Sequence, residues 1–400
     1  MKADRGFSTR PYFNYTGDHQ IMDFKEYFDY QLAQHYADRI FAVDKRFDQS
    51  AFTATLGENL LSLEMKDRVN AIADSLWLGL SLPYSEAISI ILEAVQPVST
   101  KAAIRGFPAW VASQVIETYG VDDFETSMAA IYRITQLFTG EFAIRPFIDR
   151  YPEQAFARLT EWAHDHSTDV RRLVSEGARP RLPWASRVPA LITDPAPIFK
   201  LLELLKNDPE EFVRRSVANN LNDIAKDHPD EVVAVVSKWQ QTVPVSKERD
   251  WMIRHSLRSL LKNGHPSALS LMGFDQDLPV EVNHFSIEPQ SILMGENVQL
   301  SCQLDSFNET PGKLMVDIIW WSPGANGKKN RKVFKWSKRE LRKAASITLD
   351  KQLSLKANSV RKIYPGKHEI HLIINGHNKA SSVFEVIGRE QLNTTINPVS

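Results

Sequence analysis

Three carboxylates in the middle of the chain are surrounded by arginines or short polar residues. Glu141 lies in "TGEFAIRPF", Glu176 in "DVRRLVSEGARPRLPWASRVP" and Asp223 in "VRRSVANNLNDIAKD". A neutral stack of helices does not need such polar segments, so these three segments are the places in the chain where chemistry could occur.

Two of these carboxylates also have a purely structural interpretation. The break at Thr139-Gly140 predicts that Glu141 falls in the first turn of a helix, where it would balance the helix dipole. Glu176 is expected near a helix C-terminus, off the buried stripe. There its charge is slightly unfavourable, and Arg172 four residues earlier could compensate for it.

The segment around Asp223 places Ser216, Asn219, Asn220 and Asp223 on one face of a predicted helix. Short polar side chains are poor helix formers, so their concentration needs a reason. One interpretation is a surface kept for contact, and the other is hydrogen bonding between helices that sets their register. The apolar stripe beside this face comprises Val213, Val217, Leu221 and Ile224.

The stretch "RPRLPWASR" that follows Glu176 is irregular, with three arginines, two prolines and Trp184. An exposed aromatic ring among arginines suits contact with a phosphate backbone or the face of a sugar. We therefore favour a functional role for this loop and for Trp184.

Helices must position these residues, because from Asp23 to about Phe274 the apolar residues recur at helical spacing. Four segments open with an apolar residue followed by arginine, at Arg145, Arg171, Arg214 and Arg254. Their separations are 26, 43 and 40 residues, and the last two match the ~40 to 47 residues of HEAT or armadillo repeats. This predicts an all-α, HEAT-like repeat solenoid whose concave face binds the partner.

After Gly273 the pattern changes to short β-branched segments separated by Gly, Pro and Asn. This predicts an all-β, Ig-like sandwich of about seven strands. Cys302 is the only cysteine, so no disulfide within the chain can form, which favours a reducing compartment. The predicted organisation is a flexible arm (1–21), a helical domain (22–274), a linker (275–282), an Ig-like sandwich (283–390) and a tail (391–400).

The three motifs "TGEFAIRPF", "DVRRLVSEGARPRLPW" and "VRRSVANNLNDIAKDHPD" resemble those of the DNA alkylation repair proteins built from HEAT-like repeats. With the Ig-like tail, the chain resembles the AlkC-type glycosylases over nearly its whole length after residue 22. The resemblance implies a monofunctional DNA N-glycosylase of base excision repair that removes cationic bases such as 3-methyladenine and 3-methylcytosine from duplex DNA. It also implies recognition without inserting the damaged base into a pocket. Carried over by motif, the functional carboxylates are Glu141, Glu176 and Asp223, with Trp184 beside the lesion.

DNA affinity requires a local concentration of positive charge, because the formal net charge of the 400 residues is −1. The stretch 328–343 has nine Lys or Arg and one acidic residue, between predicted strands of the Ig-like domain. It is either a solvated charged loop or a surface that neutralises phosphates. We expect DNA contacts from both domains, which would clamp the duplex: Arg172, Arg179, Arg181, Arg187, Arg214, Arg215, Asn219, Arg254, Lys328, Lys329, Arg331, Lys332 and Lys335.

No metal or nucleotide cofactor is expected, since no CxxC, P-loop or dinucleotide fingerprint occurs. No apolar run approaches the ~18 residues of a membrane span. The first twenty residues lack the apolar centre of a signal peptide. We therefore expect a cytoplasmic monomer that joins the nucleoid when bound to DNA. The competing interpretations are a non-catalytic HEAT-repeat scaffold and a protein that binds damaged DNA without cleaving it.

Overall fold

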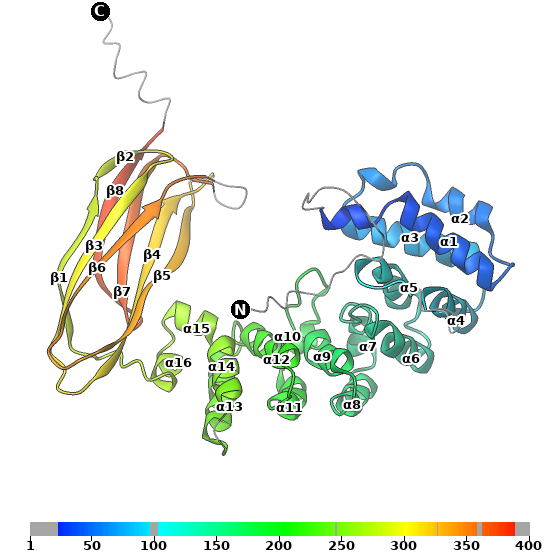
Figure 1. Ribbon diagram of the computed structural model, residues 1–400, viewed down its shortest axis with the longest axis horizontal. Helices are drawn as coiled ribbons and strands as arrows, with labels where there is room; N and C mark the ends of the chain where they lie inside the picture. The colour runs from blue at the N-terminus through cyan, green and yellow to red at the C-terminus, as the bar shows by residue number, and fades with distance from the viewer. Residues whose placement is uncertain (1–22, 97–102, 245, 326, 358–361, 389–400) are drawn as a thin grey trace, which may run out of the picture. The chain divides into compact units, whose positions relative to one another are not determined.

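The computed structural model describes residues 23–96, 103–244, 246–325, 327–357 and 362–388. Within these ranges the chain is helical as far as Leu271 and forms strands from Val280 onward (Figure 1). The prediction of an all-α region followed by an all-β sandwich is confirmed. The expected arm (1–21) and tail (391–400) lie outside the described residues.

The helices are short, and most of them are joined by tight turns (Figure 1). The α-helices in the described part are α1 (Tyr30–Val43), α2 (Gln49–Leu56), α3 (Met65–Leu80), α4 (Tyr84–Val95), α5 (Trp110–Tyr119), α6 (Phe124–Thr135), α7 (Arg145–Arg150), α8 (Pro152–Trp162), α9 (Thr168–Gly177), α10 (Pro189–Thr193), α11 (Ala196–Leu205), α12 (Glu211–Ile224), α13 (Pro229–Gln241), α14 (Lys247–Ser256), α15 (Arg258–Asn263) and α16 (Pro266–Leu271). Three 3-10 turns accompany them: η1 (Phe24–Tyr27), η2 (Leu60–Ser62) and η3 (Phe107–Ala109).

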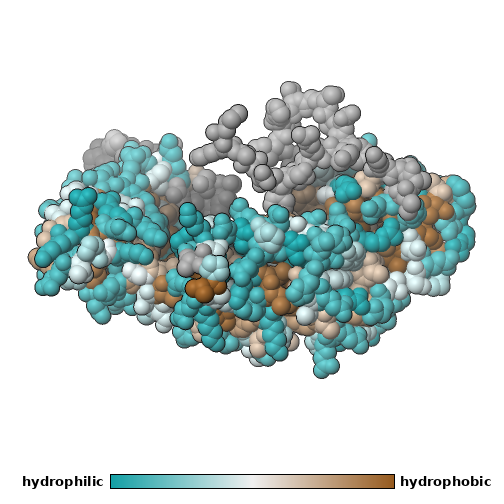
Figure 2. Space-filling view, turned by 60° about the horizontal axis from the view of Figure 1, so that its bottom comes forward, coloured by the Kyte–Doolittle hydropathy of each residue, from teal (hydrophilic) through white to brown (hydrophobic). Residues whose placement is uncertain are grey.

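The apolar stripe of each helix faces its neighbours. At the start of α11, Pro195 is the N-cap residue, and the carboxylate of Asp194 just before it accepts a hydrogen bond from the amide of Ala196 at 2.9 Å. Four residues at helical spacing are then buried, as the sequence predicted: Ile198, Leu201, Leu202 and Leu205. On the face shown in Figure 2, hydrophilic residues predominate and apolar residues form small separate patches.

Two of the repeated arginines have the same structural role. Arg171 Nη1 donates to the carbonyls of residues 165 and 166, at 2.9 and 3.1 Å. Arg214 Nη1 donates to the carbonyls of residues 208 and 209, at 2.6 and 2.7 Å. Each of these two arginines thus ties the turn before its helix to the helix itself.

The chain divides into two compact units, which are described separately. Of the described residues, the first unit comprises those up to 227 together with 246–256, and so contains α1 to α12 and α14. The second comprises the described residues of 228–244 and from 257 onward, and joins α13, α15 and α16 to the strands. The segment predicted as a linker is packed in the second unit, with Leu278 buried and β1 starting at Val280.

The strands of the second unit form two sheets around one core. The strands are β1 (Val280–Glu288), β2 (Ser291–Leu293), β3 (Asn297–Ser306), β4 (Gly312–Pro323), β5 (Lys329–Leu341), β6 (Ser346–Ser354), β7 (Gly366–Ile374) and β8 (His377–Ile387). Their orders are β1-β3-β6 and β2-β8-β7-β4-β5, and the pairs are antiparallel except β2 with β8. Alternate residues of β3 point inward, including the buried free Cys302.

Among the described residues, no single helix has the length and apolar character needed to cross a membrane. The helices α3 and α4 meet those criteria only as a pair, and that pair is bent by 117°.

Candidate active site

The structure brings the three candidate carboxylates together in the first unit. Glu141 lies in the turn before α7, Glu176 near the end of α9 and Asp223 near the end of α12. All three are buried, with exposed fractions of 9%, 5% and 2%. Carboxylates buried away from water need positively charged groups close to them. The residues that supply these groups are therefore part of the site.

Arg172 of α9 bridges the first two carboxylates. Its Nη1 lies 2.8 Å from Glu141 Oε2, and its Nη2 lies 3.6 Å from Glu176 Oε1. Thr139 Oγ1 also donates to Glu141 Oε2, at 2.7 Å. The other oxygen of this carboxylate, Oε1, accepts no hydrogen bond from the part of the chain that the structure describes. Glu141 therefore keeps lone pairs for a water molecule or a substrate.

Arg179, in the turn after α9, bridges the second and third carboxylates. Its Nη1 donates to Glu176 Oε1 at 2.5 Å, and its Nε donates to Asp223 Oδ2 at 2.8 Å. Lys226 Nζ lies 2.8 Å from the other oxygen of Asp223. Glu141, Arg172, Glu176, Arg179, Asp223 and Lys226 thus form a chain of alternating charge, called here the ion-pair chain.

The ion-pair chain keeps the Glu176 carboxylate negative despite its burial. Burial raises the pKa of Glu176, but the charges of Arg172 and Arg179 and the hydroxyl of Ser216 outweigh it and hold that pKa below its ordinary value. For Arg179, burial lowers the pKa, and the charges of Glu176 and Asp223 more than reverse this. Glu176 therefore presents a fixed negative carboxylate at neutral pH.

Two glycines allow the elements of the site to approach one another. A Cβ added to Gly177, at the end of α9, would lie 2.6 Å from Ile144 Cγ2, in the turn that carries Glu141. A Cβ at Gly140 would lie 2.6 Å from Thr135 Oγ1. Real Cβ atoms do not approach other atoms this closely. Glycine at these two positions therefore lets the turn that carries Glu141 pack close enough for Glu141 to pair with Arg172.

The prediction for the position of Glu141 is wrong in one respect. Residues 141–144 form a turn, and α7 begins only at Arg145. Proline lacks an amide hydrogen and favours the first turn of a helix, so Pro146 sets the helix start just before itself. Glu141 therefore precedes the helix by one turn and pairs with Arg172 rather than with the helix dipole.

The polar face of α12 is buried, so its interpretation as an exposed contact surface is wrong for most of its residues. Ser216, Asn220 and Asp223 are each at most 2% exposed. Asn220 Nδ2 donates to the carbonyl of Ser175 at 2.8 Å, which ties α12 to α9. Hydrogen bonding between helices, the alternative that the sequence left open, is what these residues do. Asn219 is only partly buried, and its Oδ1 lies 3.3 Å from His255 Nε2 of α14.

Trp184 lies on the surface in a loop that is firmly held. Its side chain is 56% exposed and its backbone has a φ of 64°, which is unusual for a bulky residue. Lys66 Nζ donates to the Trp184 carbonyl at 2.8 Å. Arg145 is buried and donates to the carbonyls of Gly177, Arg179 and Ser186 at distances of 2.7 to 3.0 Å; burial lowers its pKa to about 10.

Sequence reasoning gave no site role to Lys66, Arg145 or Thr139. The sequence shows Arg145 only as a repeat residue, and its buried role depends on carbonyls more than thirty residues away. Thr139 could have been noticed, because a threonine two residues before a carboxylate can donate to it.

The predicted DNA-binding residues of the first unit fall into two groups. Several are engaged within the protein: Arg172 and Arg179 in the ion-pair chain, Arg181 with Asp227, Arg214 with backbone carbonyls, and Arg215 with Glu211. Arg187 and Arg254 are exposed. The guanidinium of Arg215 also lies 5.7 Å from the centre of the Trp251 ring.

The basic stretch of the second unit is a strand, and its prediction as a loop between strands is wrong. Residues 329–341 form β5, at the edge of the five-stranded sheet. Phe334 and Trp336 pack against the core, which fixes the strand, while Lys329, Arg331 and Lys335 are exposed. Lysines on an edge strand also discourage pairing with another sheet, so this positive strip has a structural use besides any contact with phosphates.

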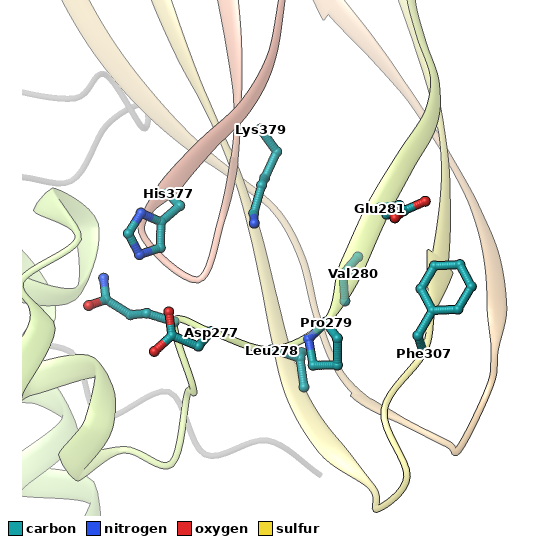
Figure 3. Close-up of a pocket in the computed structure, with 9 residues that line it drawn as sticks. Asp277, Leu278, Pro279, Val280, Glu281, Phe307, His377 and Lys379 are labelled. Atoms are coloured by element: carbon teal, nitrogen blue, oxygen red, sulfur yellow. The ribbon is translucent and has the colours of Figure 1, made fainter.

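Two shallow hollows lie in the second unit, and neither is lined by the candidate carboxylates. In one, of about 340 Å³, the chain from Asp277 to Val280 runs between His377 and Lys379 of β8 on one side and Phe307 on the other (Figure 3). Within the described residues, no group of three or more His, Cys, Asp or Glu side chains could hold a metal ion.

Comparisons with known proteins show which family the chain resembles. A family model described as "DNA alkylation repair enzyme" matches residues 139–260, and one described as "Uncharacterised protein YhaZ, C-terminal Ig-like domain" matches residues 281–388. The chain is 34% identical over 367 residues to the uncharacterized protein YhaZ of Bacillus subtilis, a match that covers 92% of this chain and 100% of YhaZ. It is also similar to the solved structure of the alkylpurine DNA glycosylase AlkC of Pseudomonas fluorescens bound to DNA containing an abasic site analog, with a TM-score of 0.82, 34% identity, and coverage of 92% of this chain and 100% of that one. The chain therefore belongs to the DNA alkylation repair enzyme family, in its AlkC-like group with a C-terminal Ig-like domain.

Proposed function

We propose that this protein is a DNA N-glycosylase that releases cationic N3-alkylated bases, such as 3-methyladenine and 3-methylcytosine, from duplex DNA. The observation that carries the proposal is the ion-pair chain, in which three buried carboxylates are held in fixed places by three cations. The likeness to AlkC, whose structure contains DNA with an abasic site analog, supports it.

The chemistry needs no general acid. An alkyl group on N3 makes the base cationic, so the C1′–N bond breaks with its electron pair leaving on the base, which departs neutral. Positive charge then develops on C1′ and the ring oxygen of the deoxyribose. Water adds to C1′ and loses its proton, which leaves an abasic site. Negative oxygens that are already oriented stabilise this transition state without first having to reorganise.

We assign Asp223 and Glu176 as the carboxylates that face the sugar, stabilise its charge and position water, with Glu141 assisting. The Glu141 oxygen that accepts no hydrogen bond within the described chain suits a water molecule. The exposed ring of Trp184 can offer its face to the same developing cation, an interaction of about 0.5–2 kcal/mol.

Selectivity would come from the leaving group rather than from a pocket that encloses the base. Only a base that already carries a positive charge departs readily, so base flipping into a deep site is not required. The exposed cations of β5 and the exposed Arg187 and Arg254 of the first unit would neutralise phosphates. We expect the protein to act as a cytoplasmic monomer.

The test is the spectrum of bases released from methylated duplex DNA, separated and identified by mass spectrometry. Wild-type protein should release 3-methyladenine and 3-methylcytosine well above the spontaneous rate. Asp223→Asn and Glu176→Gln should each lower the release by a factor of about a hundred or more, the scale found when one transition-state contact is lost. Both variants should bind DNA with an abasic site analog as the wild type does.

The alternatives predict other results. A protein that only recognises damaged DNA would bind alkylated duplex and release no base. A scaffold for a protein partner would do neither. Normal release by both carboxylate variants would contradict the assigned site even if the activity itself is found.

A further inference from the structure

Ser216 of α12 makes a hydrogen bond that the proposed chemistry does not yet use. The residue is 2% exposed, and its hydroxyl lies 2.6 Å from Glu176 Oε2. The hydroxyl of Ser175, on α9, lies 2.7 Å from the Ser216 hydroxyl. With Asn220 bound to the Ser175 carbonyl at 2.8 Å, these contacts join α9 and α12 at one buried point.

The protons in this group can be assigned from its chemistry. An ionised carboxylate only accepts hydrogen bonds, so Ser216 must donate its single proton to Glu176. The Ser216 oxygen can then only accept from Ser175. Ser175 therefore turns its hydroxyl proton toward Ser216 rather than toward the Arg172 carbonyl, which lies 3.1 Å away. The donors run in one direction, from Ser175 to Ser216 to Glu176.

Ser216 differs from the other partners of Glu176 in where it lies. Arg172 is on the same helix as Glu176, and Arg179 follows three residues later. Ser216 is, within the described chain, the one direct partner that another helix supplies. It comes from α12, which also carries Asp223. The Ser216 hydroxyl therefore fixes where the Glu176 carboxylate stands relative to the second carboxylate.

We infer that Ser216 is a positioning residue for base excision: it orients Glu176 Oε2 and favours the charged form of that carboxylate. Ser175 supports it by ordering the Ser216 hydroxyl. This inference rests on the proposed function, and it adds a residue whose only contact with the reaction is through Glu176.

Removal of the hydroxyl should also change the pH dependence of excision. A hydrogen bond donated to a carboxylate favours its ionised form, so its loss moves the protonation of Glu176 to higher pH. The charged groups facing Glu176 otherwise remain: Arg172 of α9, Arg179 after it, Asp223 and Lys226 of α12, and Glu141 before α7.

The experiment compares Ser216→Ala with wild type and with Ser113→Ala. Ser113 of α5 is a matched control, because its hydroxyl is also fully buried but has no hydrogen-bond partner among the described residues. For each protein, the single-turnover rate of 3-methyladenine release is measured from pH 4 to pH 8. Affinity for duplex with an abasic site analog and urea unfolding are measured on the same samples.

We expect Ser216→Ala to release base roughly ten to a hundred times more slowly, the range for loss of a hydrogen bond to a charged group. The acidic side of its pH–rate profile should move to higher pH, and its affinity for the abasic duplex should stay within about twofold, since Ser216 acts through Glu176 alone. Ser113→Ala should match the wild type in all three.

Three outcomes would overturn the inference. The first is a wild-type rate in Ser216→Ala, and the second is an equal loss of rate in Ser113→Ala. The third is a loss of rate in Ser216→Ala that comes with an equal loss of DNA affinity and no change in the pH profile. The last would mean that the hydroxyl only maintains helix packing. If the wild-type protein itself releases no base, the proposed function fails, and the inference fails with it for that separate and visible reason.

Discussion

The guanidinium of Arg179 lies 2.8 Å from the carboxylate of Asp223, and both residues are more than nine-tenths buried. The same guanidinium holds Glu176 through its other end. One cation therefore compensates two carboxylates on different helices. Removing one member of a buried pair leaves an uncompensated charge away from water, which costs far more than losing a pair at the surface.

Arg179→Gln should therefore lower the free energy of unfolding at pH 7 by about 3–5 kcal/mol, as measured by urea denaturation. Arg181→Gln is the matched control, because Arg181 also pairs with an aspartate, Asp227, but both side chains are about a quarter exposed. That variant should lose at most about 1 kcal/mol. Equal losses in the two variants would contradict the view that burial of the ion-pair chain makes it costly to break.

The pH dependence of stability follows from the direction of the pKa shift. The pKa of Glu176 in the folded protein lies below its ordinary value of 4.5. Its contribution to stability is then complete above the unfolded-state value and is lost as the pH falls through the lower, folded value. Glu176→Gln should remove this contribution, so the free energy of unfolding of the variant should decrease less than that of wild type on acidification below pH 4.5.

The pKa of Glu117 in α5 is shifted in the opposite direction, so the same acid titration should give the opposite result at this residue. Burial raises its pKa, and the charges of Lys66 and Arg145 only partly counter this. Ionised Glu117 therefore destabilises the folded protein, and this penalty is relieved as the pH falls toward 4.5. Glu117→Gln lacks this relief, so the free energy of unfolding of the variant should fall more steeply than that of wild type as the pH is lowered toward 4.5. If both glutamine variants changed the slope in the same direction, the assignment of these two shifts would be wrong.

Trp184 allows function and stability to be separated at one position. A tryptophan at φ 64° is strained, and glycine adopts this conformation freely. Trp184→Gly should therefore leave the free energy of unfolding unchanged or raise it by about 1 kcal/mol. If Trp184 contacts the sugar as proposed, the variant should nevertheless lower the rate of base release about tenfold, because it lacks the ring that would stabilise the developing cation. Reduced stability together with a normal rate would show that the ring serves the fold instead.

The helices could be predicted from the local sequence, whereas the ion pairs and hydrogen bonds that hold the site together could not. The buried stripe of α11 follows directly from apolar spacing, and Asp194 marks its start. The pair of Arg179 with Asp223 spans 44 residues, and the bond of Ser216 to Glu176 spans 40. Such partners depend on how α9 packs against α12, which no local pattern encodes.

The basic stretch shows the same limit for strands. Lysine and arginine are weak strand formers, so their density in 329–341 favoured a loop. Pairing along the whole of β4 and the packing of Phe334 and Trp336 outweigh that preference. The alternation of Phe334 and Trp336 with lysines was the available signal, and it is short enough to be hidden by the charge around it.

The last prediction concerns this strand and separates its two uses. Lys328, Arg331 and Lys332 form no ion pair within the described residues, so their charges are available to an outside partner. Changing all three to glutamine should weaken binding to duplex DNA and reduce the slope of log affinity against log salt by about 2–3, since each neutralised phosphate contributes ~0.9. The control changes three exposed lysines of the helices to glutamine: Lys200, Lys238 and Lys247.

The control carries the same change in net charge, so it isolates the place of the charge from its amount. If β5 contacts phosphates, only the first variant loses slope, and fluorescence anisotropy across a salt series shows the difference. If lysines on β5 serve mainly to keep the sheet edge from pairing with other sheets, both variants bind alike, and the β5 variant instead aggregates at high protein concentration. Equal slopes without aggregation would contradict both uses of the strip and would confine DNA binding to the first unit.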